Sequence, residues 1–323
     1  MKIGKVENCL VIGLGQIGLK YDIGLSEEYV LTHSRSVDSH PEFELVGGVD
    51  KNKINRDTFV KNYGKPVYSD IKKGILETKP SIIIISSPTS THLSILDNII
   101  EASSPKAILC EKPLDSDPNN ASEMIKKCSD NDIQLFVNYI RRCDPGSLQI
   151  KKMIDMGKIN KPIKGIVWYS KGLKNNGSHF INLLESWFGE CTNVKNISKG
   201  KSYIDLEDND YDFTLSFQNV EIIFYSSLEN SNSYNSIELM SSSGRLLYEN
   251  GGDKIFWQAV NESNLLDSDK KLIQENMNKY QYNVLNSISN VLKNKNTSIS
   301  RGEDAYKTQK TIMRIINGEK NGN

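Results

Sequence analysis

The chain has 323 residues, enough for two domains with sizeable hydrophobic cores. Lys plus Arg and Asp plus Glu both number 40, so no net charge favours nucleic acid or an anionic membrane as a partner. No apolar run approaches the roughly 20 residues that span a bilayer, and Glu7 and Asn8 interrupt the start too early for a signal peptide. The five cysteines form no CxxC pair, which predicts reduced thiols, a cytoplasmic protein and no metal site.

Short apolar runs alternate with helical patterns through the first 140 residues. The run 81–86 is β-branched without polar alternation, so it should be buried on both faces, as a central parallel strand is. This alternation predicts an α/β, doubly wound Rossmann sheet in a dinucleotide-binding domain spanning residues 1–140. The expected strands are 6–12, 43–49, 81–86, 107–110 and 134–137, and the expected helices are 52–62, 71–78, 92–102 and 119–129.

The pattern changes after residue 140, where two helical segments lead into a series of short strands. The segment 211–217 alternates strictly, so one of its faces should be buried and the other exposed. We predict a second, α+β domain over residues 141–323 with an open-faced, mostly antiparallel sheet. The expected helices are 148–156, 179–188, 267–292 and 302–316, the last of which can pack back on the first domain; the expected strands are 163–170, 211–217, 220–228, 236–241, 245–249 and 254–258.

A glycine-rich loop follows the first expected strand. Gly13, Gly15 and Gly18 have the GxGxxG spacing that permits a turn, a close approach to a pyrophosphate and the packing of a helix on the sheet. The same spacing occurs in tight turns that bind nothing, so the strand before the loop and the helix expected after it carry the interpretation. We expect a dinucleotide here, with Gln16 and Ile17 beside it.

Asp50 ends the second expected strand, where an acidic residue meets the adenosine ribose. Its carboxylate would accept from the 2′-hydroxyl and repel a 2′-phosphate, which favours NAD over NADP. Lys51 follows directly, and Arg56 is close enough in sequence to reach a phosphate, so NADP stays the alternative.

The interval from Gly18 to Asp50 exceeds the usual ~20 residues of this motif. We interpret the excess as an insertion at residues 21–31, after which Thr32 caps a resumed helix. The insertion lies near the expected cofactor crevice, and it is either a surface loop or a substrate contact.

A polar segment leaves the central strand at its carboxyl end, the edge at which doubly wound sheets bind ligands. Pro88 should end the strand, and Thr89 or Thr91 should cap the next helix. We expect Ser87, Pro88 and Thr89 to run along the cofactor and His92 to contact it. For His92 a role at the start of the helix is favoured over a catalytic role.

The tripeptide Glu111-Lys112-Pro113 closes the apolar run 107–110. A hydride that leaves a carbinol carbon must be matched by a proton that leaves its oxygen. A lysine partly desolvated at the end of a buried strand suits that proton transfer. The alternative is a plain surface lysine at the end of a strand.

The chain resembles the glucose–fructose oxidoreductase and inositol dehydrogenase family (Gfo/Idh/MocA) over nearly its whole length. The matching elements are GLGQIG at 13–18, SSPTSTH at 86–92, CEKPL at 110–114, NYIRRCDP at 138–145 and NGSHFIN at 176–182. The resemblance implies an NAD(P)-dependent dehydrogenase or reductase acting on a sugar, a cyclitol or a nucleotide-linked sugar. It also implies a homodimer or homotetramer that forms through the exposed face of the second domain's sheet.

The resemblance further implies that Lys112 and His179 sit against the nicotinamide and face the substrate, with Lys112 as general acid/base. It implies a cis Pro113 and cofactor contacts from Glu111 and Asn138. His179 could instead be a capping or core histidine.

The family's usual His-x-x-Asp pattern ends here in Asn182. The Asn182 amide can hydrogen-bond to the imidazole of His179 or recognise a substrate hydroxyl, but it cannot stabilise an imidazolium with charge. This difference moves the expected proton transfer toward Lys112.

Two further residues are candidates for substrate binding. Arg142, or Arg141 beside it, could bind a substrate phosphate or carboxylate, or could pair with Asp144 or a neighbouring acid. Asn176, on the loop before the histidine motif, is expected to touch substrate.

Two alternatives to this enzyme stay open. A dinucleotide-binding regulator or scaffold could keep the fold without turnover; Asn182 favours this alternative, and the intact Lys112 and His179 oppose it. An oxidoreductase acting on a non-sugar ring is the other. Enzyme and regulator would both bind NADH, but only the enzyme would oxidise it when a keto-sugar is supplied.

Overall fold

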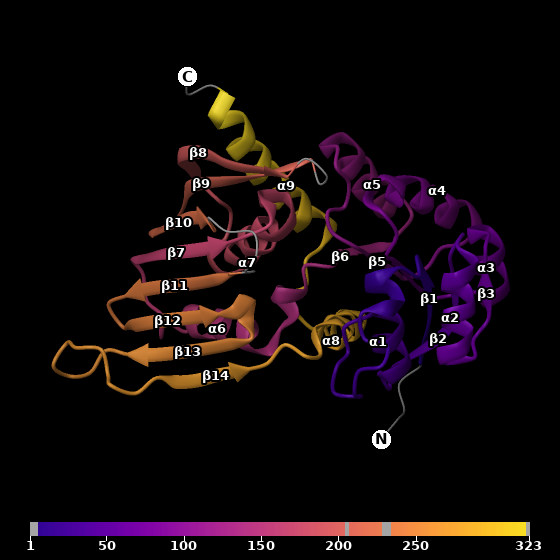
Figure 1. Ribbon diagram of the computed structural model, residues 1–323, viewed down its shortest axis with the longest axis horizontal. Helices are drawn as coiled ribbons and strands as arrows, with labels where there is room; N and C mark the ends of the chain where they lie inside the picture. Colours follow the sequence, from indigo (N-terminus) through magenta and orange to yellow (C-terminus); the bar gives the residue numbers. More distant parts are fainter. Residues whose placement is uncertain (1–5, 204–206, 228–233, 321–323) are drawn as a thin grey trace. The chain divides into compact units, whose positions relative to one another are not determined.

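The computed structural model describes residues 6–203, 207–227 and 234–320, and the chain divides into two compact units (Figure 1). Unit 1 contains the chain up to Cys143 and also the later segment Asn278–Tyr306. Unit 2 contains Asp144–Met277 and the chain from Lys307 onward. The sequence pattern predicted one change of domain near residue 140 and allowed the last helix to pack back on the first domain. The start of that helix does lie in unit 1, but the return of α8 was not anticipated. Within the described ranges, none of the helices combines the length and apolarity that a bilayer crossing needs.

Unit 1 is built on a parallel six-stranded sheet in the order β3-β2-β1-β4-β5-β6. The chain reverses its direction of winding between β1 and the adjacent β4, so the predicted doubly wound fold is confirmed. The strands are β1 Glu7–Ile12, β2 Phe43–Val49, β3 Val67–Tyr68, β4 Ile82–Ile85, β5 Ala107–Cys110 and β6 Gln134–Val137. The helices are α1 His33–Ser39, α2 Lys53–Tyr63, α3 Ile71–Thr78, α4 His92–Ala102, α5 Pro118–Asp130, α8 Tyr280–Leu292 and the first turn of α9 Gly302–Lys320.

Helices cover both faces of this sheet, which is why its central strands are apolar throughout. The four isoleucines of β4 are all fully buried, as the run without polar alternation predicted. Apolar residues of α3, α4 and α5 pack on one face, and those of α1, α2 and α8 pack on the other. Burial of each such side chain stabilises the fold by about 1.5–3 kcal/mol.

Of the side-chain caps in unit 1, that of Thr32 was predicted and is confirmed, whereas that of Asp117 was not predicted. Thr32 caps α1 by accepting from Arg35 N, and Asp117 caps α5, with Pro118 in its first turn. The predicted cap of α4 is wrong: the residues before it form the 3₁₀ turn Thr89–Thr91. The Thr91 hydroxyl donates to Pro88 O and caps nothing.

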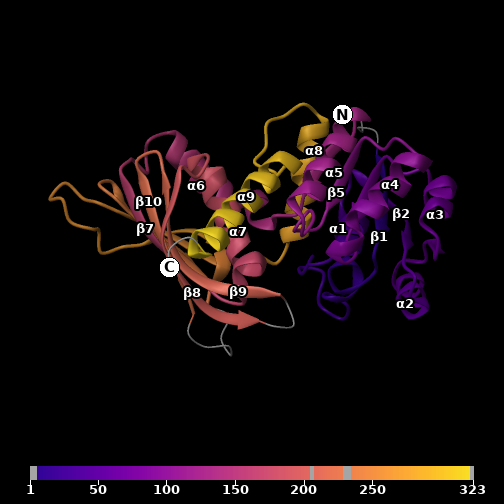
Figure 2. The ribbon, with the colours of Figure 1, turned by 90° about the horizontal axis from the view of Figure 1, so that it is seen from above.

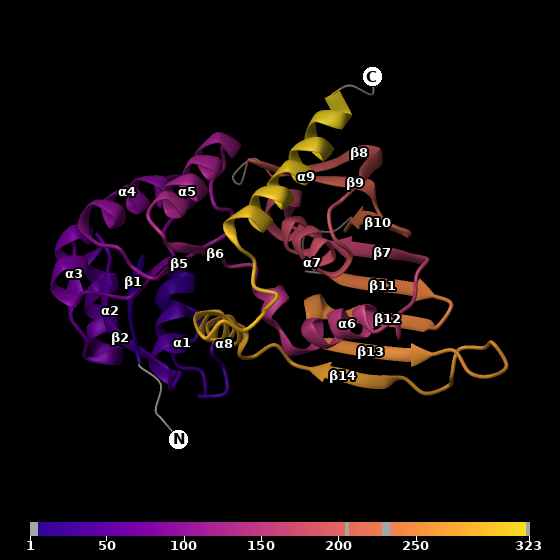
Figure 3. The ribbon, with the colours of Figure 1, turned by 180° about the vertical axis from the view of Figure 1, so that it is seen from behind.

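Unit 2 contains an eight-stranded sheet in the order β14-β13-β12-β11-β7-β10-β9-β8, in which β7 and β10 form the parallel pair. The helices α6, α7 and the later turns of α9 lie on one face, as Figures 2 and 3 show, and their apolar side chains fill a common core with the strands. The strands are β7 Ile163–Tyr169, β8 Asn193–Tyr203, β9 Asp208–Phe217, β10 Val220–Ser226, β11 Ser236–Ser241, β12 Gly244–Glu249, β13 Lys254–Ala259 and β14 Lys271–Glu275; the helices are α6 Pro145–Asp155 and α7 Ser178–Phe188.

The structure of unit 2 differs from the prediction in three places. The expected long helix at 267–292 is the edge strand β14 followed by α8, which begins only at Tyr280. The strand β8 was not predicted, because its lysine-rich sequence shows no apolar alternation; it is an edge strand, where charged side chains are tolerated. The expected strand 220–228 ends at Ser226, and residue 228 lies outside the described residues.

Candidate functional site

The carboxyl ends of four strands in unit 1 lie level with one another. Ile12 pairs with Ile85, and Ile85 pairs with Cys110. Cys110 pairs in turn with Val137. The glycine loop, the serine-rich segment, the Glu111-Lys112-Pro113 tripeptide and Asn138 therefore leave the sheet at one edge, next to the point at which its winding reverses. This is the edge at which open α/β sheets bind their ligands.

The glycine loop is closed on its sheet side and open on the other. Gly13 has φ +96°, and a Cβ on it would lie 2.6 Å from the backbone of Ser86 and Ser87. A Cβ on Gly18 would collide with Gly13 O, whereas a Cβ on Gly15 would meet nothing within 4 Å. The loop therefore keeps a bare backbone at Gly15, which fits a phosphate ligand. The expected helix after the loop is a single π-helical turn, Gln16–Lys20.

Replacement of Gly15 by alanine separates a phosphate-binding loop from a plain turn. The added methyl group meets no protein atom, so we expect an unchanged urea midpoint. NADH affinity, measured by fluorescence titration, should fall at least about 10-fold because the methyl group obstructs the pyrophosphate. Wild-type NADH affinity in Gly15→Ala would contradict the assignment of this loop.

The Asp50 carboxylate is held beside the glycine loop. Its Oδ2 accepts from Leu14 N at 2.8 Å and Asn55 Nδ2 at 3.0 Å, and its Oδ1 accepts from Asn52 N at 2.7 Å. The guanidinium of Arg56 donates to the carbonyl oxygens of Asp50 and Lys51, at 2.7 and 2.8 Å. Arg56 is thus engaged with the backbone, and a carboxylate is hydrogen-bonded to the backbone of the loop, which fits the ribose of NAD.

His92 does not contact solvent, so the expected cofactor contact is replaced by a structural one. It is fully buried at the start of α4, and its ring nitrogens lie 3.0 Å from the carbonyl oxygens of Ser87 and Leu114. The ring therefore links the serine-rich segment to the segment after Lys112. Ser87 and Thr89 are partly exposed and Pro88 is exposed, so their surfaces are accessible to a ligand.

Lys112 follows β5 directly and is partly exposed at the carboxyl edge. The Lys112–Pro113 peptide bond is cis, as the family resemblance implied. The backbone nitrogen of Lys112 donates to Glu111 Oε2 at 3.2 Å. The glutamate of the motif thus holds the backbone that carries the lysine.

Glu111 is the centre of a buried hydrogen-bond network that the sequence did not reveal. His33 Nε2 lies 2.7 Å from Glu111 Oε1, and Asn138 Nδ2 donates to the same oxygen at 2.6 Å. Asn138 Nδ2 also lies 3.2 Å from Gln281 Oε1, on α8. Asn138 is 2 % exposed and is directed at Glu111, so the expected cofactor contact is not available to its side chain. No sequence spacing connects His33 or Gln281 to the motif.

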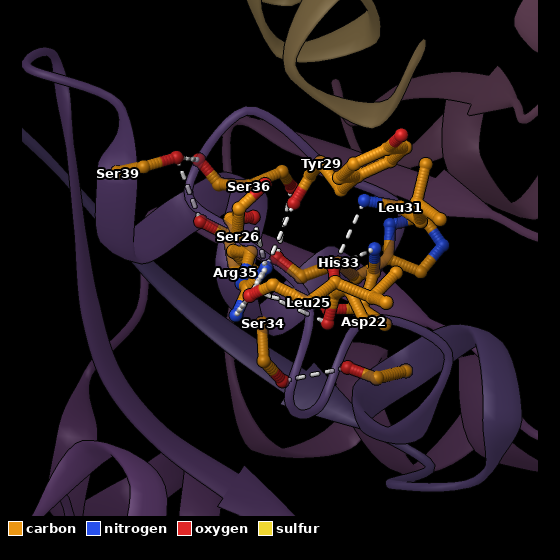
Figure 4. A network of polar contacts seen from close by, with 12 residues as sticks. Asp22, Leu25, Ser26, Tyr29, Leu31, His33, Ser34, Arg35, Ser36 and Ser39 are labelled. Carbon is orange, nitrogen blue, oxygen red and sulfur yellow. Dashed lines mark hydrogen bonds and ion pairs between the residues drawn. The ribbon is translucent and has the colours of Figure 1, made fainter. Parts of the chain in front are cut away.

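The insertion is an ordered loop anchored on one buried carboxylate (Figure 4). Asp22 accepts from the backbone nitrogens of Leu31 and Thr32 and from the Thr32 hydroxyl, at 2.8–3.0 Å. Arg35 donates to carbonyl oxygens inside the loop, including that of Tyr29 at 2.9 Å. The end of the loop also bonds α8 and the residues before it, since Val30 N donates to Asn278 O at 2.7 Å.

Arg142 is engaged within unit 1, which corrects its expected role in substrate binding. Its side chain is 10 % exposed, its Nε donates to Ser298 O at 2.7 Å, and its NH2 lies 3.4 Å from Asp304 Oδ2. The alternative of a structural ion pair with a neighbouring acid holds, and Asp304 is such an acid. A buried guanidinium with these partners is not available to a phosphate.

In unit 2, His179 is the second residue of α7 and is 9 % exposed. Asn182 lies one turn further along the helix, is fully buried and donates to Thr308 Oγ1 on α9 at 2.9 Å. Thr308 and Thr311 both donate to Glu185 on α7, at 2.5 and 2.8 Å. Asn182 therefore links α7 to α9, and its expected substrate contact stays a prediction.

The loop before His179 is held by two buried carboxylates of β9. Asp210 accepts from Gly172 N at 3.0 Å and from the Tyr203 hydroxyl at 2.8 Å. Asp208 accepts from the backbone nitrogens of residues 174 and 175, at 3.1 and 3.0 Å. Burial raises the pKa of Asp210 above its ordinary value. Asn176, the expected substrate contact, is partly exposed on this anchored turn.

Comparison with known proteins finds relatives among oxidoreductases for the first part of the chain. Residues 7–139 match the model of an oxidoreductase family described as having an NAD-binding Rossmann fold, GFO_IDH_MocA. The inositol 2-dehydrogenase of Rhizobium meliloti is 30 % identical over 131 residues, 40 % of this chain and 38 % of that protein. The scyllo-inositol 2-dehydrogenase (NAD(+)) of Bacillus subtilis is 31 % identical over 157 residues, 48 % of this chain and 42 % of that protein. The chain thus spans less than half the length of these curated relatives.

A solved structure shows that the likeness in fold extends over both units. The WlbA dehydrogenase from Bordetella pertussis, in complex with NADH and UDP-GlcNAcA, superimposes with a TM-score of 0.77. The alignment covers 100 % of this chain and 98 % of that one, at 15 % sequence identity. The shared fold therefore includes the open-faced sheet of unit 2.

Proposed function

We propose, on the premise that this chain belongs through residues 7–139 to the Gfo/Idh/MocA family of oxidoreductases, that it is an NAD(P)-dependent dehydrogenase or reductase. Its substrate is a sugar, a cyclitol or a nucleotide-linked sugar, the class to which the names of its relatives point. One observation carries the proposal: Lys112 leaves the sheet at the same level as the open glycine loop, two strands away from it.

The residues of unit 1 that would hold the cofactor are Gly15 with Gln16 and Ile17, Asp50, and the segment Ser87–Thr89. Backbone amides of the loop bind the pyrophosphate, and Asp50 accepts from the ribose. We propose NAD rather than NADP because Asp50 repels a 2′-phosphate and Arg56 is occupied by backbone carbonyls. When bound, the nicotinamide gives or accepts a hydride.

The proton that accompanies the hydride is assigned to Lys112. In oxidation its amine takes the proton from the substrate hydroxyl, and in reduction its ammonium returns a proton to the keto oxygen. For unit 2, the proposed roles are binding of a substrate hydroxyl by His179 and contact with the substrate by Asn176. Asn182 keeps α7 in place through its bond to Thr308 on α9.

A substrate panel tests this function. Free sugars, cyclitols and nucleotide sugars are assayed with NAD and with NADP by the absorbance of the reduced nicotinamide, with Lys112→Ala as the control. We expect at least one substrate class to give turnover that depends on Lys112 and is faster with NAD. A wild-type protein that binds NADH but turns over nothing in the panel, keto-sugars included, would instead be a regulator or scaffold.

The exposed face of the sheet in unit 2 supports a homo-oligomer, and we propose that a second copy of this chain covers it. Trp168 on β7 is 39 % exposed, and its ring lies 5.3 Å from that of Tyr225 on β10. Met240 on β11 is 40 % exposed. Clustered apolar side chains of this kind mark protein interfaces.

The five cysteines of the chain are free thiols, which supports a cytoplasmic location.

A charge on this face should prevent oligomer formation. Trp168→Glu is expected to reduce the native mass from that of a dimer or tetramer to that of a monomer, because two carboxylates would be buried across the symmetric interface. Light scattering after size exclusion measures the mass. The control is Leu76→Glu, which puts the same charge on an apolar site that is 59 % exposed on α3 of unit 1 and should leave the mass unchanged. A dimer of Trp168→Glu would rule out this face.

A further inference from the structure

His33, which no motif connects to the site, bonds the glutamate that precedes Lys112. It is the first residue of α1, directly after the anchored insertion (Figure 4), and it is 1 % exposed. Its Nε2 lies 2.7 Å from Glu111 Oε1, while its Nδ1 has no hydrogen-bond partner among the described residues. Glu111 is therefore the group that orients this ring.

Glu111 is ionised in this network. Burial raises its pKa, but the hydrogen bond and charge of His33, the hydrogen bond of Asn138 and the charge of Lys112 outweigh burial and lower the pKa below its ordinary value. An ionised carboxylate only accepts hydrogen bonds, so His33 donates through Nε2–H.

The carboxylate of Glu111 is fixed from both of its oxygens. Oε1 accepts from His33 and Asn138, and Oε2 accepts from the backbone nitrogen of Lys112 at 3.2 Å. The negative charge therefore stays next to the lysine. If the His33 hydrogen bond were lost, the carboxylate could rotate away from the Lys112 backbone or take up a proton.

We propose that His33 is a positioning residue for Lys112: by orienting the Glu111 carboxylate, it fixes the backbone of the lysine and holds the charge of the preceding residue in place. The consequence for catalysis rests on the proposed function, but the coupling of His33 to Lys112 through Glu111 does not. Among the described residues, the titratable groups that act on Glu111 are His33 on α1 and Lys112, and Glu111 acts in turn on Cys110 on β5 and Tyr280 on α8. Cys128 and Asp115 also act on Cys110, and Asp22, Tyr21 and Arg141 also act on Tyr280.

The test measures the protonation of Lys112 without any turnover. The full-length protein is acetylated with trace acetic anhydride over a range of pH, and the labelling of Lys112 is quantified by peptide mass spectrometry. Glu111→Gln removes the charge, so the midpoint of Lys112 labelling should fall by about one pH unit. His33→Leu should lower the midpoint in the same direction by about half a unit, and His33→Gln, which retains a donor, should restore it.

A double-mutant cycle shows whether His33 acts through Glu111. In the Glu111→Gln background, His33→Leu should cause no further shift in the midpoint of Lys112 labelling. A merely structural effect of His33→Leu would instead add to the shift caused by Glu111→Gln. His40→Leu is the matched control: this histidine is also buried beside α1 but bonds Asn286, so the midpoint should not move. If His33→Leu does not fold, His33→Asn, whose shorter amide does not reach Glu111, replaces it.

An unchanged midpoint in a folded His33→Leu variant, or equal shifts in both backgrounds, would overturn the proposal. The pH profile of kcat should move with the labelling midpoint in any variant that turns over. A wild-type protein inactive toward the whole substrate panel would refute the proposed function while the labelling cycle still gave its answer, so the two failures are distinguishable.

Discussion

Replacement of Lys112 by alanine is expected to lower kcat by about three orders of magnitude while NADH affinity stays within about threefold of wild type. The amine is the group at the carboxyl edge of unit 1 to which we assign the proton of the substrate hydroxyl, and alanine offers no substitute. The glycine loop and Asp50 do not involve the lysine side chain, so cofactor binding should persist. Steady-state kinetics with the best substrate of the panel and fluorescence titration of NADH measure the two effects.

Two variants distinguish proton transfer from simple charge at this position. Lys112→Arg keeps a positive charge but cannot release a proton, so it should be nearly as inactive as the alanine variant. Lys106→Ala removes a lysine from the opposite end of the same strand, where it pairs with Glu7, and should leave kcat unchanged. Substantial activity of Lys112→Arg would show that Lys112 acts as a charge and not as an acid or base.

Replacement of Gly13 by alanine is expected to lower the free energy of unfolding by about 3 kcal/mol. The residue has φ +96°, where an L side chain is strained, and its Cβ would lie 2.6 Å from the backbone of Ser86 and Ser87. That backbone cannot yield easily, because Ser86 N donates to Ile12 O at 2.8 Å. Urea denaturation measures the change.

Gly24→Ala separates strain from packing in this prediction. Gly24 has φ +83° in the insertion, but nothing lies within 4 Å of an added Cβ. Gly24→Ala should therefore lower the free energy of unfolding only by the backbone strain, about 1 kcal/mol. Equal losses of stability in Gly13→Ala and Gly24→Ala would mean that the contact between the glycine loop and Ser86 contributes nothing.

The sheet of unit 1 could be predicted because its signals are local. The four isoleucines of β4 indicate a strand buried on both faces, and Thr32 indicates a helix start through a hydrogen bond to a residue three positions away. Burial on both faces leaves little choice of residue type, so the pattern and the structure agree there.

The sheet of unit 2 was harder to predict because its edges carry little apolar pattern. The strand β8 is held by backbone pairing with β9, and its exposed lysines show no alternation. The strand β14 was predicted as part of a helix, because residues 267–292 contain enough spaced apolar residues to suggest one. Pairing with β13 decides its conformation, and pairing is a non-local property.

The exposed fraction of each side chain distinguishes the candidate site residues that are accessible to a ligand from those that bond other protein groups. Lys112 and Asn176 are partly exposed, whereas Asn138 and Asn182 are fastened to neighbouring protein groups. The sequence shows the same residue type whether a polar side chain faces a ligand or bonds neighbouring protein groups. The surrounding hydrogen-bond partners, which come from distant segments, decide between them.

By itself, the amino-acid sequence determined the doubly wound first unit, the loop that approaches a dinucleotide and the lysine at the strand end, since each depends on residues close together in the chain. Only the tertiary structure joined His33 to Glu111 and Arg142 to Asp304, and only it returned α8 to unit 1. These contacts link segments far apart in the chain. Their formation depends on which polar groups remain to be satisfied once the apolar faces have been buried, and a one-dimensional pattern does not contain that information.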